Sequence, residues 1–377
     1  MRSLLAKPSA DLRFYDNTLR DGEQAPGVWF SPTQKVEIAK LLCDLGIDFL
    51  SVGFPAVGRH ERQAIESVLR AVPPERTVGL ARCCEADIQL VADAGIPCVS
   101  LFYPGSEILR RAKSKYLRND ELDALIVSCC RFARSLGMSV LFAFEDMLRC
   151  EIDWVVDRYK RYLPVVDAFG LTDTIGTGTP RVIDEYTRAL LPLDRPIVTH
   201  FHNDMGLATA NTLAAIESGA QIAGTTVSGI GERAGNASLE ETAVAVSRLL
   251  GKKHGVQLSR LAGASEFVQR ESGILLDPLR PIVGKHAFVH ESGIHIDSLL
   301  RDERSYQAIA PTAVGRKMQF VLGKHSSKRA ICWFLESNGL DASAGAIEQA
   351  REIIESALEH GVVHIEEALR RSLGLPT

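Results

Sequence analysis

Short hydrophobic runs alternate with amphipathic segments over the first 250 residues of the chain. The first run, Leu12–Thr18, has the length of a strand, and the next segment predicts a helix that begins after Ser31 and ends before Gly46. Ser31 occupies the N-cap position, Pro32 the first helical position, and Gln34 completes the pattern of a capping box. Gly46 is typical of the residue that follows a helix C-terminus.

The same strand-and-helix unit recurs seven more times. The predicted strands are residues 48–55, 77–83, 97–105, 139–146, 168–176, 196–204 and 222–231, and the predicted helices are residues 60–72, 85–95, 119–137, 152–163, 179–191, 207–219 and 239–250. Eight units of this kind favour a closed (β/α)8 TIM barrel of parallel strands. The alternative, an open doubly wound sheet, places a G-x-G-x-x-G turn after its first strand, and the sequence has no such turn there.

Beyond about residue 250 the alternation stops. Residues 255–325 mix loops with short helical segments, whereas residues 328–339, 343–361 and 364–374 have helical periodicity. We therefore predict a catalytic barrel over 1–265, a linker subdomain over 266–325 and a helical C-terminal subdomain over 326–377. The expected fold is an α/β TIM barrel followed by a smaller, mostly helical C-terminal region.

Composition and charge limit the classes of partner. The 377 residues carry a formal net charge of −4, which gives no general attraction for nucleic acid or for an anionic membrane. No apolar run approaches the ~20 residues that a membrane span needs. The eight cysteines form no C-x-x-C pair, and no signal-peptide segment follows Met1. These features predict a cytoplasmic protein with reduced thiols and no nucleic-acid or membrane partner.

Polar and ionisable residues gather where the predicted strands end. TIM barrels place their active sites at the C-terminal ends of the strands. The residues found there are Asp16, Arg20, Asp21 and Glu23 after the first strand, Glu145 and Asp146 at the fifth, Asp173 and Thr174 at the sixth, His200, His202, Asn203 and Asp204 at the seventh, and Glu232, Arg233 and Asn236 after the eighth.

The strongest chemical signal among them is the pair His200 and His202. Residues two apart on a strand point to one face, and neutral imidazoles are good ligands for divalent transition metals. Closure of the barrel makes strands 7, 8 and 1 neighbours, so Asp21 and Asn236 can reach the same point and leave positions open for a chelating substrate. Three alternatives stay open: an incidental histidine pair, an Asp21 that only pairs with Arg20, and an Asn236 that only caps the last barrel helix.

Five separated segments resemble the homocitrate synthase and isopropylmalate synthase family of acyl-CoA-dependent Claisen condensation enzymes. They read YDNTLRDGEQAPG, HFHNDMGLATANTLAAI, GIGERAGNASLEE, HESGIHIDSLL and VLGKHSSKRA, and the resemblance runs from about residue 12 to about residue 330. The short homocitrate synthases of the nitrogen-fixation type are the most similar group. The resemblance implies a barrel enzyme that uses a divalent metal (Mg, Mn or Zn) to condense acetyl-CoA with a 2-oxo acid, with hydrolysis of the thioester.

The resemblance also implies roles for residues of the barrel. Arg20 would stabilise the developing alkoxide and contact the substrate, Thr174 would bind the substrate carboxylate, and Glu145 matches the family's catalytic glutamate. An alternative for Glu145 is a buried ion pair with Arg82 or Arg149. The metal ligands implied by the motifs are Asp21, His200, His202 and Asn236.

A further implication concerns the region after the barrel. His295 and Tyr306 match the family's general-base pair, with His290 as a second possibility for the base. In the family this segment reaches into the barrel of the partner chain, so a homodimer with shared active sites is expected. The alternative is that His295 is an ordinary surface histidine.

The identity of the acceptor rests on weaker signals. The chain ends at Thr377, before a leucine-regulated domain, which favours homocitrate synthase and 2-oxoglutarate as the acceptor. Leu141 and Ala143 depart from the Arg and Ser that some homocitrate synthases carry, so Arg82 is our candidate for binding the distal carboxylate. The alternatives are 2-phosphonomethylmalate, isopropylmalate or citramalate synthase. A metal-dependent acyl-CoA lyase is a different class, and it would carry a cysteine after strand 8, where GIGERAGNAS has none.

Overall fold

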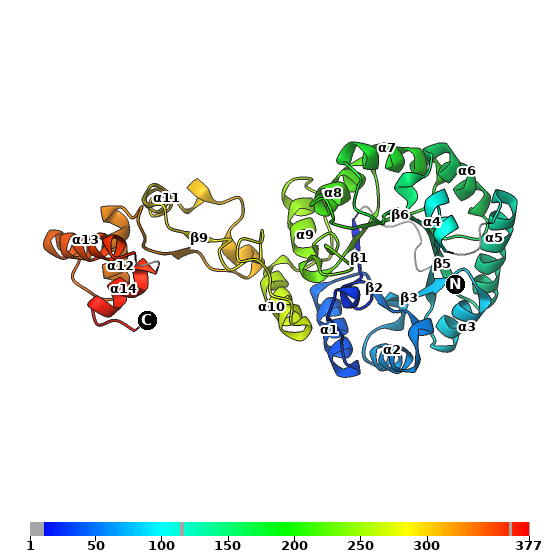
Figure 1. Ribbon diagram of the computed structural model, residues 1–377, viewed down its shortest axis with the longest axis horizontal. Coiled ribbons are helices and arrows are strands. Elements are labelled where there is room, and N and C mark those ends of the chain that lie inside the picture. The colour runs from blue at the N-terminus through cyan, green and yellow to red at the C-terminus, as the bar shows by residue number, and fades with distance from the viewer. Residues whose placement is uncertain (1–10, 114–116, 362–363, 377) are drawn as a thin grey trace. The chain divides into compact units, whose positions relative to one another are not determined.

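The computed structural model describes residues 11–113, 117–361 and 364–376. Its first part is a closed barrel of parallel strands, with helices on the outside (Figure 1). The last strand pairs with the first from Ile222 opposite Arg13 to Thr225 opposite Asp16, which closes the barrel. The predicted TIM barrel is confirmed. Its strands are β1 (Arg13–Asp16), β2 (Phe49–Gly53), β3 (Thr77–Arg82), β4 (Cys98–Pro104), β5 (Ser139–Glu145), β6 (Ala168–Asp173), β7 (Ile197–Phe201) and β8 (Ile222–Thr225).

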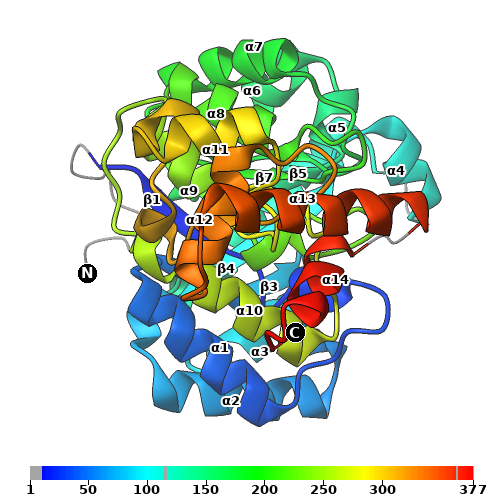
Figure 2. The same ribbon diagram turned by 90° about the vertical axis from the view of Figure 1, so that its left-hand side faces the viewer.

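The helices around the barrel follow the strands as predicted, and neighbouring pairs such as α1 with α2 and α7 with α8 pack against each other (Figures 1 and 2). They are α1 (Pro32–Leu45), α2 (Arg59–Ala71), α3 (Glu85–Asp93), α4 (Glu107–Ala112), α5 (Asn119–Ser135), α6 (Ile152–Tyr162), α7 (Pro180–Leu190), α8 (Ala208–Ser218), α9 (Leu239–Arg248) and α10 (Leu261–Ser272). Short 3-10 helices occupy several loops of this unit: Gly22–Gln24, Pro55–Val57, Pro74–Arg76, Met147–Arg149, Leu191–Leu193, Val227–Gly229 and Leu258–Arg260.

The ends of α1 show how local sequence sets the element boundaries. The Ser31 hydroxyl accepts the Gln34 backbone N–H at 3.3 Å, and Gln34 Oε1 accepts the Ser31 backbone N–H at 2.9 Å. Gly46 ends the helix with φ 88°, and a Cβ at this position would lie 2.2 Å from the Gly255 carbonyl oxygen. Only glycine therefore meets both requirements, and the predicted capping box and C-terminal glycine are confirmed.

The inside of the barrel is closed by a layer of side chains to which every strand contributes one residue. Such a layer makes the barrel a packed core and leaves space for ligands only at its mouth. The residues of the layer are Tyr15, Phe49, Val78, Cys98, Leu141, Ala168, Val198 and Ile222, all of them buried.

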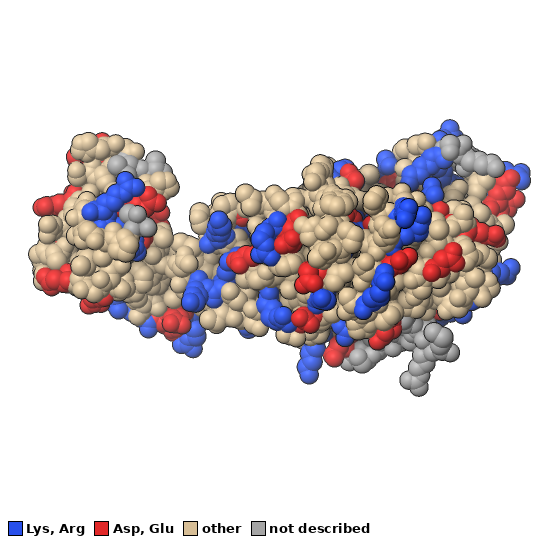
Figure 3. All heavy atoms as spheres, turned by 90° about the horizontal axis from the view of Figure 1, so that it is seen from below, with Lys and Arg blue, Asp and Glu red and all other residues tan. Residues whose placement is uncertain are grey.

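The chain divides into two compact units, the first ending at Leu275 and the second beginning at Leu276. The helix α10 continues across residue 265 within the first unit. On the face drawn in Figure 3, acidic and basic side chains are interspersed. Among the described residues, no helix is both long enough and apolar enough to cross a bilayer.

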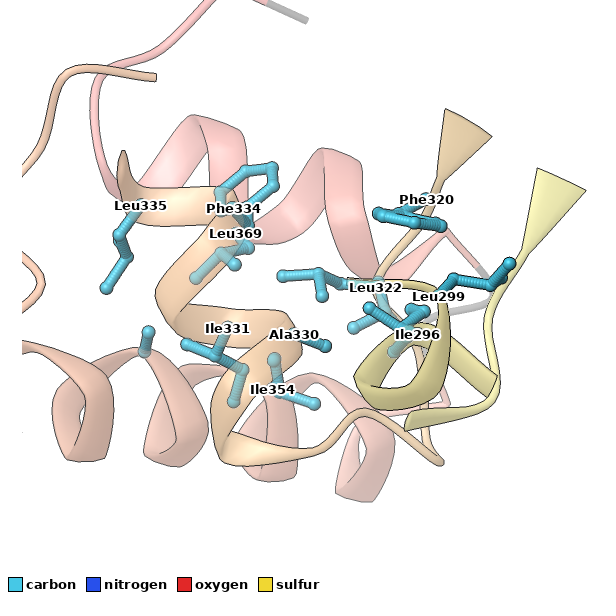
Figure 4. Close-up of a cluster of buried hydrophobic side chains, with 12 residues drawn as sticks. Ile296, Leu299, Phe320, Leu322, Ala330, Ile331, Phe334, Leu335, Ile354 and Leu369 are labelled. Carbon is cyan, nitrogen blue, oxygen red and sulfur yellow. The ribbon is translucent and has the colours of Figure 1, made fainter. Parts of the chain in front are cut away.

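The second unit has a small hydrophobic core of its own (Figure 4). Four helices supply most of its buried side chains, together with Phe320 and Leu322. The helices predicted over 328–339, 343–361 and 364–374 are confirmed. The elements of this unit are β9 (Val289–His290), α11 (Gly293–Leu299), the 3-10 helices Glu303–Tyr306 and Pro311–Val314, β10 (Gln319–Phe320), α12 (Lys328–Ser337), α13 (Ala344–Glu359) and α14 (Ile365–Ser372).

Candidate active site

Three of the four predicted metal ligands converge at the mouth of the barrel. Asp21 lies in the loop after β1, His200 is near the end of β7, and His202 follows that strand. One ligand atom from each of these residues lies within 4.8 Å of the other two. The seventh and first strands are brought together by β8, which pairs with both. The histidine pair is thus part of a cluster that can hold a cation.

Asn236 completes the same cluster from the loop after β8. Its Nδ2 donates to Asp21 Oδ1 at 2.7 Å, and its backbone forms an isolated antiparallel bridge with His202. The cap of α9 is the Ser238 side chain, so capping is not the role of Asn236. In the described structure, Asn236 Oδ1 and His202 Nδ1 are buried without a hydrogen-bond partner. A carboxylate, an amide oxygen and two imidazoles are a ligand set that fits a divalent cation, and a cation would satisfy buried atoms that have no other partner.

The space around the cluster is kept open by glycine. A Cβ at Gly231 would lie 2.2 Å from Asn236 Nδ2 and 2.6 Å from Asp21 Oδ1. Any side chain at this position would therefore occupy the volume in which Asp21 and Asn236 meet.

Electrostatics favour the protonation states that a metal requires. Burial lowers the pKa of His200 to about 3 and also lowers the pKa of His202. Burial alone would raise the pKa of Asp21, but the Arg20 guanidinium holds it well below its ordinary value. Neutral imidazoles and an ionised carboxylate therefore face one another at neutral pH, and these are the forms that bind metal.

Arg20 lies beside the cluster and lines the adjoining cavity. Its Nη1 contacts Asp21 Oδ2 at 2.6 Å, and its Nη2 donates to Asn17 Oδ1 at 2.9 Å. The pairing of Asp21 with Arg20 is thus real, but it coexists with the cluster, since His200 Nε2 lies 3.7 Å from the same Asp21 oxygen. A fixed positive charge stands next to the predicted cation site.

Hydrogen bonds to both its side chain and its backbone carbonyl hold Thr174 in position. Its hydroxyl accepts the Asp146 backbone N–H at 2.8 Å, so its own hydrogen remains available to donate into the cavity. Its carbonyl oxygen accepts from Arg233 Nη2 at 2.6 Å, and Arg233 also binds Asp204. Asp146 and Arg233 both adopt the left-handed conformation, with φ 59° and 55°. Strained residues of this kind are frequent at functional sites.

Glu145 lines the cavity but has a partner that the sequence did not suggest. Its two carboxylate oxygens accept from Lys113 Nζ at 2.9 and 2.7 Å. Neither proposed alternative holds, because Arg149 pairs with Asp146 and Arg82 with Asp87. The sequence does contain a glutamate at the end of the fifth strand and a basic segment, residues 110–113, after the fourth strand. Spacing alone does not show that they form an ion pair.

Arg82 does not line this cavity. Its Nε and Nη2 donate to the two oxygens of Asp87 at 2.6 and 2.9 Å, and its side chain is 61% exposed. Asp87 stands in the first turn of α3, where the helix dipole favours an acid, so the signal was present in the sequence. The cavity is lined by six of the barrel residues to which the sequence analysis assigned a role, and Arg82 is not one of them: the six are Arg20, Asp21, Glu145, Thr174, His200 and His202.

The cavity itself has a volume of 290 Å³ and opens next to the metal cluster. Its walls combine the polar groups already described with an apolar surface, of which the sequence analysis singled out only Leu141 and Ala143. The apolar and aromatic side chains are Tyr15, Phe54, Leu80, Phe102, Leu141, Ala143, Phe144 and Val198.

The predicted general-base residues lie in the second unit. The His295 and Tyr306 rings stack with centroids 3.9 Å apart and an interplanar angle of 20°. His290 lies 6.0 Å from His295 between ring centroids, and burial lowers its pKa. Tyr306 is 44% exposed, so this pair is accessible on the surface of its unit.

Two family descriptions match the chain, one for each unit. Residues 11–268 match the HMGL-like family, and residues 282–361 match the homocitrate synthase post-HMGL domain-like family. A probable 2-isopropylmalate synthase of Methanopyrus kandleri is 38% identical over 93% of this chain and 70% of the relative. Homocitrate synthase AksA of the same organism is 38% identical over 92% and 85%, and a putative (R)-citramalate synthase of Archaeoglobus fulgidus is 37% identical over 93% and 71%.

Solved structures agree on the fold. The HMG-CoA lyase of Bacillus subtilis matches with a TM-score of 0.63 at 21% identity, over 71% of this chain and 96% of that one. The HMG-CoA lyase of Brucella melitensis also matches with a TM-score of 0.63, at 19% identity over 71% and 100%. The fold alone does not identify the family, but the family descriptions and the sequence relatives do. The chain belongs to the homocitrate synthase and isopropylmalate synthase family of acyltransferases, which condense acetyl-CoA with 2-oxo acids.

Proposed function

We propose that this chain joins the methyl carbon of acetyl-CoA to the keto carbon of a 2-oxo acid at the barrel mouth. Water then cleaves the thioester, so that the products are free CoA and a 2-hydroxy acid with one carboxylate more than the acceptor. The observation that carries the proposal is the Asp21, His200 and His202 cluster, with donor atoms within 4.8 Å, beside Arg20 at the wall of a cavity. Family membership supports the same reaction class.

Each barrel residue has a defined task in this reaction. Asp21, His200, His202 and Asn236 would hold a divalent cation, which when bound supplies Lewis acidity toward the keto group. Arg20 places a fixed positive charge where negative charge develops on the keto oxygen. The free Thr174 hydroxyl hydrogen can donate to the C1 carboxylate of the acceptor, which orients the keto carbon.

Removal of a proton from the acetyl methyl group needs a base that is held next to it. We assign it to His295, with Tyr306 stacked on its ring and Glu145 lining the cavity as the acidic partner. In this proposal the second unit of one chain serves the barrel of its partner in a homodimer. His290 is the second candidate for the base.

The expected acceptor, 2-oxoglutarate, lacks one element of support. Arg82 is the candidate for binding the distal carboxylate of 2-oxoglutarate. Its guanidinium is held by Asp87, however, and Arg82 is not among the residues that line the cavity. The same consideration applies to a phosphonate-bearing acceptor. The named relatives include isopropylmalate, homocitrate and citramalate synthases, so family membership leaves the acceptor open.

The second candidate function is the reverse type of reaction, carbon–carbon bond cleavage by an acyl-CoA lyase. The observation that favours it is the likeness of the fold to HMG-CoA lyases. That likeness is one of fold alone, and the loop after β8 has no cysteine. The sequence relatives of higher identity are synthases, so we rank condensation first.

The test is release of free CoA thiol by the purified protein with acetyl-CoA, Mg²⁺, Mn²⁺ or Zn²⁺, and a panel of 2-oxo acids. We expect turnover with at least one acceptor and its loss in His202→Ala. The matched control is His60→Ala, an exposed histidine of α2, which should retain activity. Calorimetric titration with Mn²⁺ gives a second readout, and His202→Ala should bind at least about tenfold more weakly. Absence of turnover with every acceptor, together with unchanged metal affinity in His202→Ala, would contradict the proposal.

A further inference from the structure

The cavity has two chemically different sides. The metal cluster and Arg20 come from the loops and strand ends of β1, β7 and β8. In the strand order of the barrel, β3, β4 and β5 lie across from these strands. The wall that they supply is mostly apolar: its members are Leu80, Phe102, Leu141, Ala143 and Phe144, with Ser100 as a neutral polar residue and Glu145 at the end of β5. An acceptor whose keto acid end is held at the cluster therefore directs its side chain toward an apolar wall.

The charges of the described lining do not provide for a second anionic group. The lining contains two cations, Arg20 and Arg233, and both belong to the metal side of the cavity. Arg20 binds Asp21 and Asn17, and Arg233 binds Asp204 and the Thr174 carbonyl oxygen.

On the opposite side, the charged residue of the lining is an anion, Glu145. Its charge is paired with Lys113, a residue outside the lining whose Nζ also lies 5.7 Å from the centre of the Phe102 ring. A carboxylate placed against this wall would lose its water, would find no unpaired cation among the described lining residues, and would meet Glu145.

We infer that the acceptor is a 2-oxo acid with an apolar side chain, and that acceptors ending in a second carboxylate or a phosphonate are rejected. The inference rests on the proposed condensation, because it assumes that the keto acid end binds at the metal cluster. Leu80, Phe102, Leu141 and Ala143 determine the specificity by contact with the side chain. This assignment departs from the 2-oxoglutarate expected from the sequence.

The test compares acceptors of equal shape that differ in charge. 2-Oxoglutarate is paired with 5-methyl-2-oxohexanoate, and oxaloacetate with 4-methyl-2-oxopentanoate, since an isopropyl group replaces the carboxylate in each pair. The enzyme with Mn²⁺ and acetyl-CoA should favour the apolar member by at least about 100-fold in kcat/KM, because an unpaired buried carboxylate is strongly disfavoured. A ratio near one, or preference for the dicarboxylate in both pairs, overturns the inference and leaves the condensation proposal intact. Absence of turnover with all acceptors, by contrast, would contradict the condensation proposal itself.

Two variants locate the source of the preference. Leu80→Arg places a cation on the apolar wall at a half-buried position and should shift the ratio toward 2-oxoglutarate by at least about tenfold, whereas Leu80→Met should preserve it. Lys113→Met should change both members of a pair by the same factor and leave their ratio unchanged. A selective loss of dicarboxylate turnover in Lys113→Met would show instead that Lys113 turns from Glu145 to the acceptor. Thermal unfolding confirms that each variant is folded, and the wild-type ratios decide the inference without any variant.

Discussion

Gly231 illustrates how one backbone position controls the candidate metal site. A Cβ at this residue would lie 2.2 Å from Asn236 Nδ2 and 2.6 Å from Asp21 Oδ1. Gly231→Ala should therefore displace both side chains and weaken Mn²⁺ binding by about 10- to 100-fold, the range seen when groups that orient metal ligands are disturbed. The measurement is isothermal titration of the metal-free protein.

The control for Gly231→Ala is the same substitution at Gly263, in the first turn of α10 and with open space around its Cβ position. Gly263→Ala should leave metal affinity unchanged and stabilise the fold by about 0.5–1 kcal/mol, because alanine loses less backbone entropy in a helix. Equal metal affinity in the two variants would show that Asp21 and Asn236 do not act together.

Asp16 is a buried carboxyl whose ionisation opposes folding. Its Oδ1 accepts the Thr18 backbone N–H at 2.8 Å, but its Oδ2 is buried with no partner in the described structure. Burial raises its pKa to about 7. The folded protein therefore keeps a proton that the unfolded chain releases near pH 4, so the contribution of Asp16 to stability is greatest below pH 4 and falls as pH rises to about 7.

Asp16→Asn should remove this pH dependence, because the amide stays neutral. Between pH 5 and pH 8 the variant should gain about 2 to 3 kcal/mol relative to the wild type, by the relation between pKa and free energy. Urea unfolding at the two pH values measures this difference. Asp120→Asn, at an exposed position of α5, should show no such gain. A constant difference at Asp16 across this range would mean that its carboxyl is already ionised in the fold at pH 5.

At the scale of elements, a buried lysine of α1 joins the loops after β1 and β2. Lys35 is 1% exposed, and its Nζ contacts Glu23 at 2.7 Å and Glu61 at 2.6 Å. Glu23 accepts the Phe30 backbone N–H, and Glu61 accepts the backbone N–H of Phe54, which lines the cavity. The charge of Lys35 thus fixes the position of two loops at the barrel mouth.

Lys35→Met should lower the free energy of unfolding by about 3 kcal/mol, because it leaves two carboxylates that are only 17% and 13% exposed without a counter-charge. Denaturant titration measures the loss. Lys40→Met is the matched control on the same helix, since Lys40 and Glu37 are each 50% exposed in their ion pair, and it should change stability by less than about 1 kcal/mol. Similar effects of the two substitutions would disprove the special role of Lys35.

The elements themselves were largely predictable, and for a local reason. Hydrophobic periodicity, the Ser31 and Gln34 capping box and Gly46 are properties of adjacent residues, so they define helices and strands without tertiary information. Barrel closure then follows from the number of units, and it brings Asp21 to His200 and His202. Strand ends were less predictable: β8 ends at Thr225, because a 3-10 helix over Val227–Gly229 replaces the last part of the expected strand.

Ion pairs and the character of the cavity wall were not predictable in the same way. The pairs of Arg82 with Asp87 and of Lys113 with Glu145 depend on the conformations that these long side chains adopt above the strand ends. Sequence spacing limits which charges can meet but does not choose among them. The apolar wall likewise combines inward-facing residues of several strands, and it becomes visible only when their side chains share one cavity.

At the scale of the whole molecule, the candidate catalytic groups are divided between two compact units. The metal cluster belongs to the first unit, and the stacked pair of His295 and Tyr306 belongs to the second. If the second unit serves the barrel of a partner chain, as we propose, a defect in one unit can be complemented by a chain with a defect in the other.

His202→Ala and His295→Ala should each be inactive alone, and a mixture that has been dissociated and reassembled should recover about a quarter of wild-type activity. Random assembly makes half of the dimers mixed, and each mixed dimer of a symmetric pair has one intact site of two. Free CoA thiol release measures the recovery, and sedimentation or light scattering verifies the dimer. No recovery from a mixture shown by mass spectrometry of tagged chains to contain mixed dimers would place His295 in the site of its own chain. Full activity of His295→Ala alone would instead show that His295 is not the base. His290, whose pKa is lowered by burial, would then be the candidate for the base.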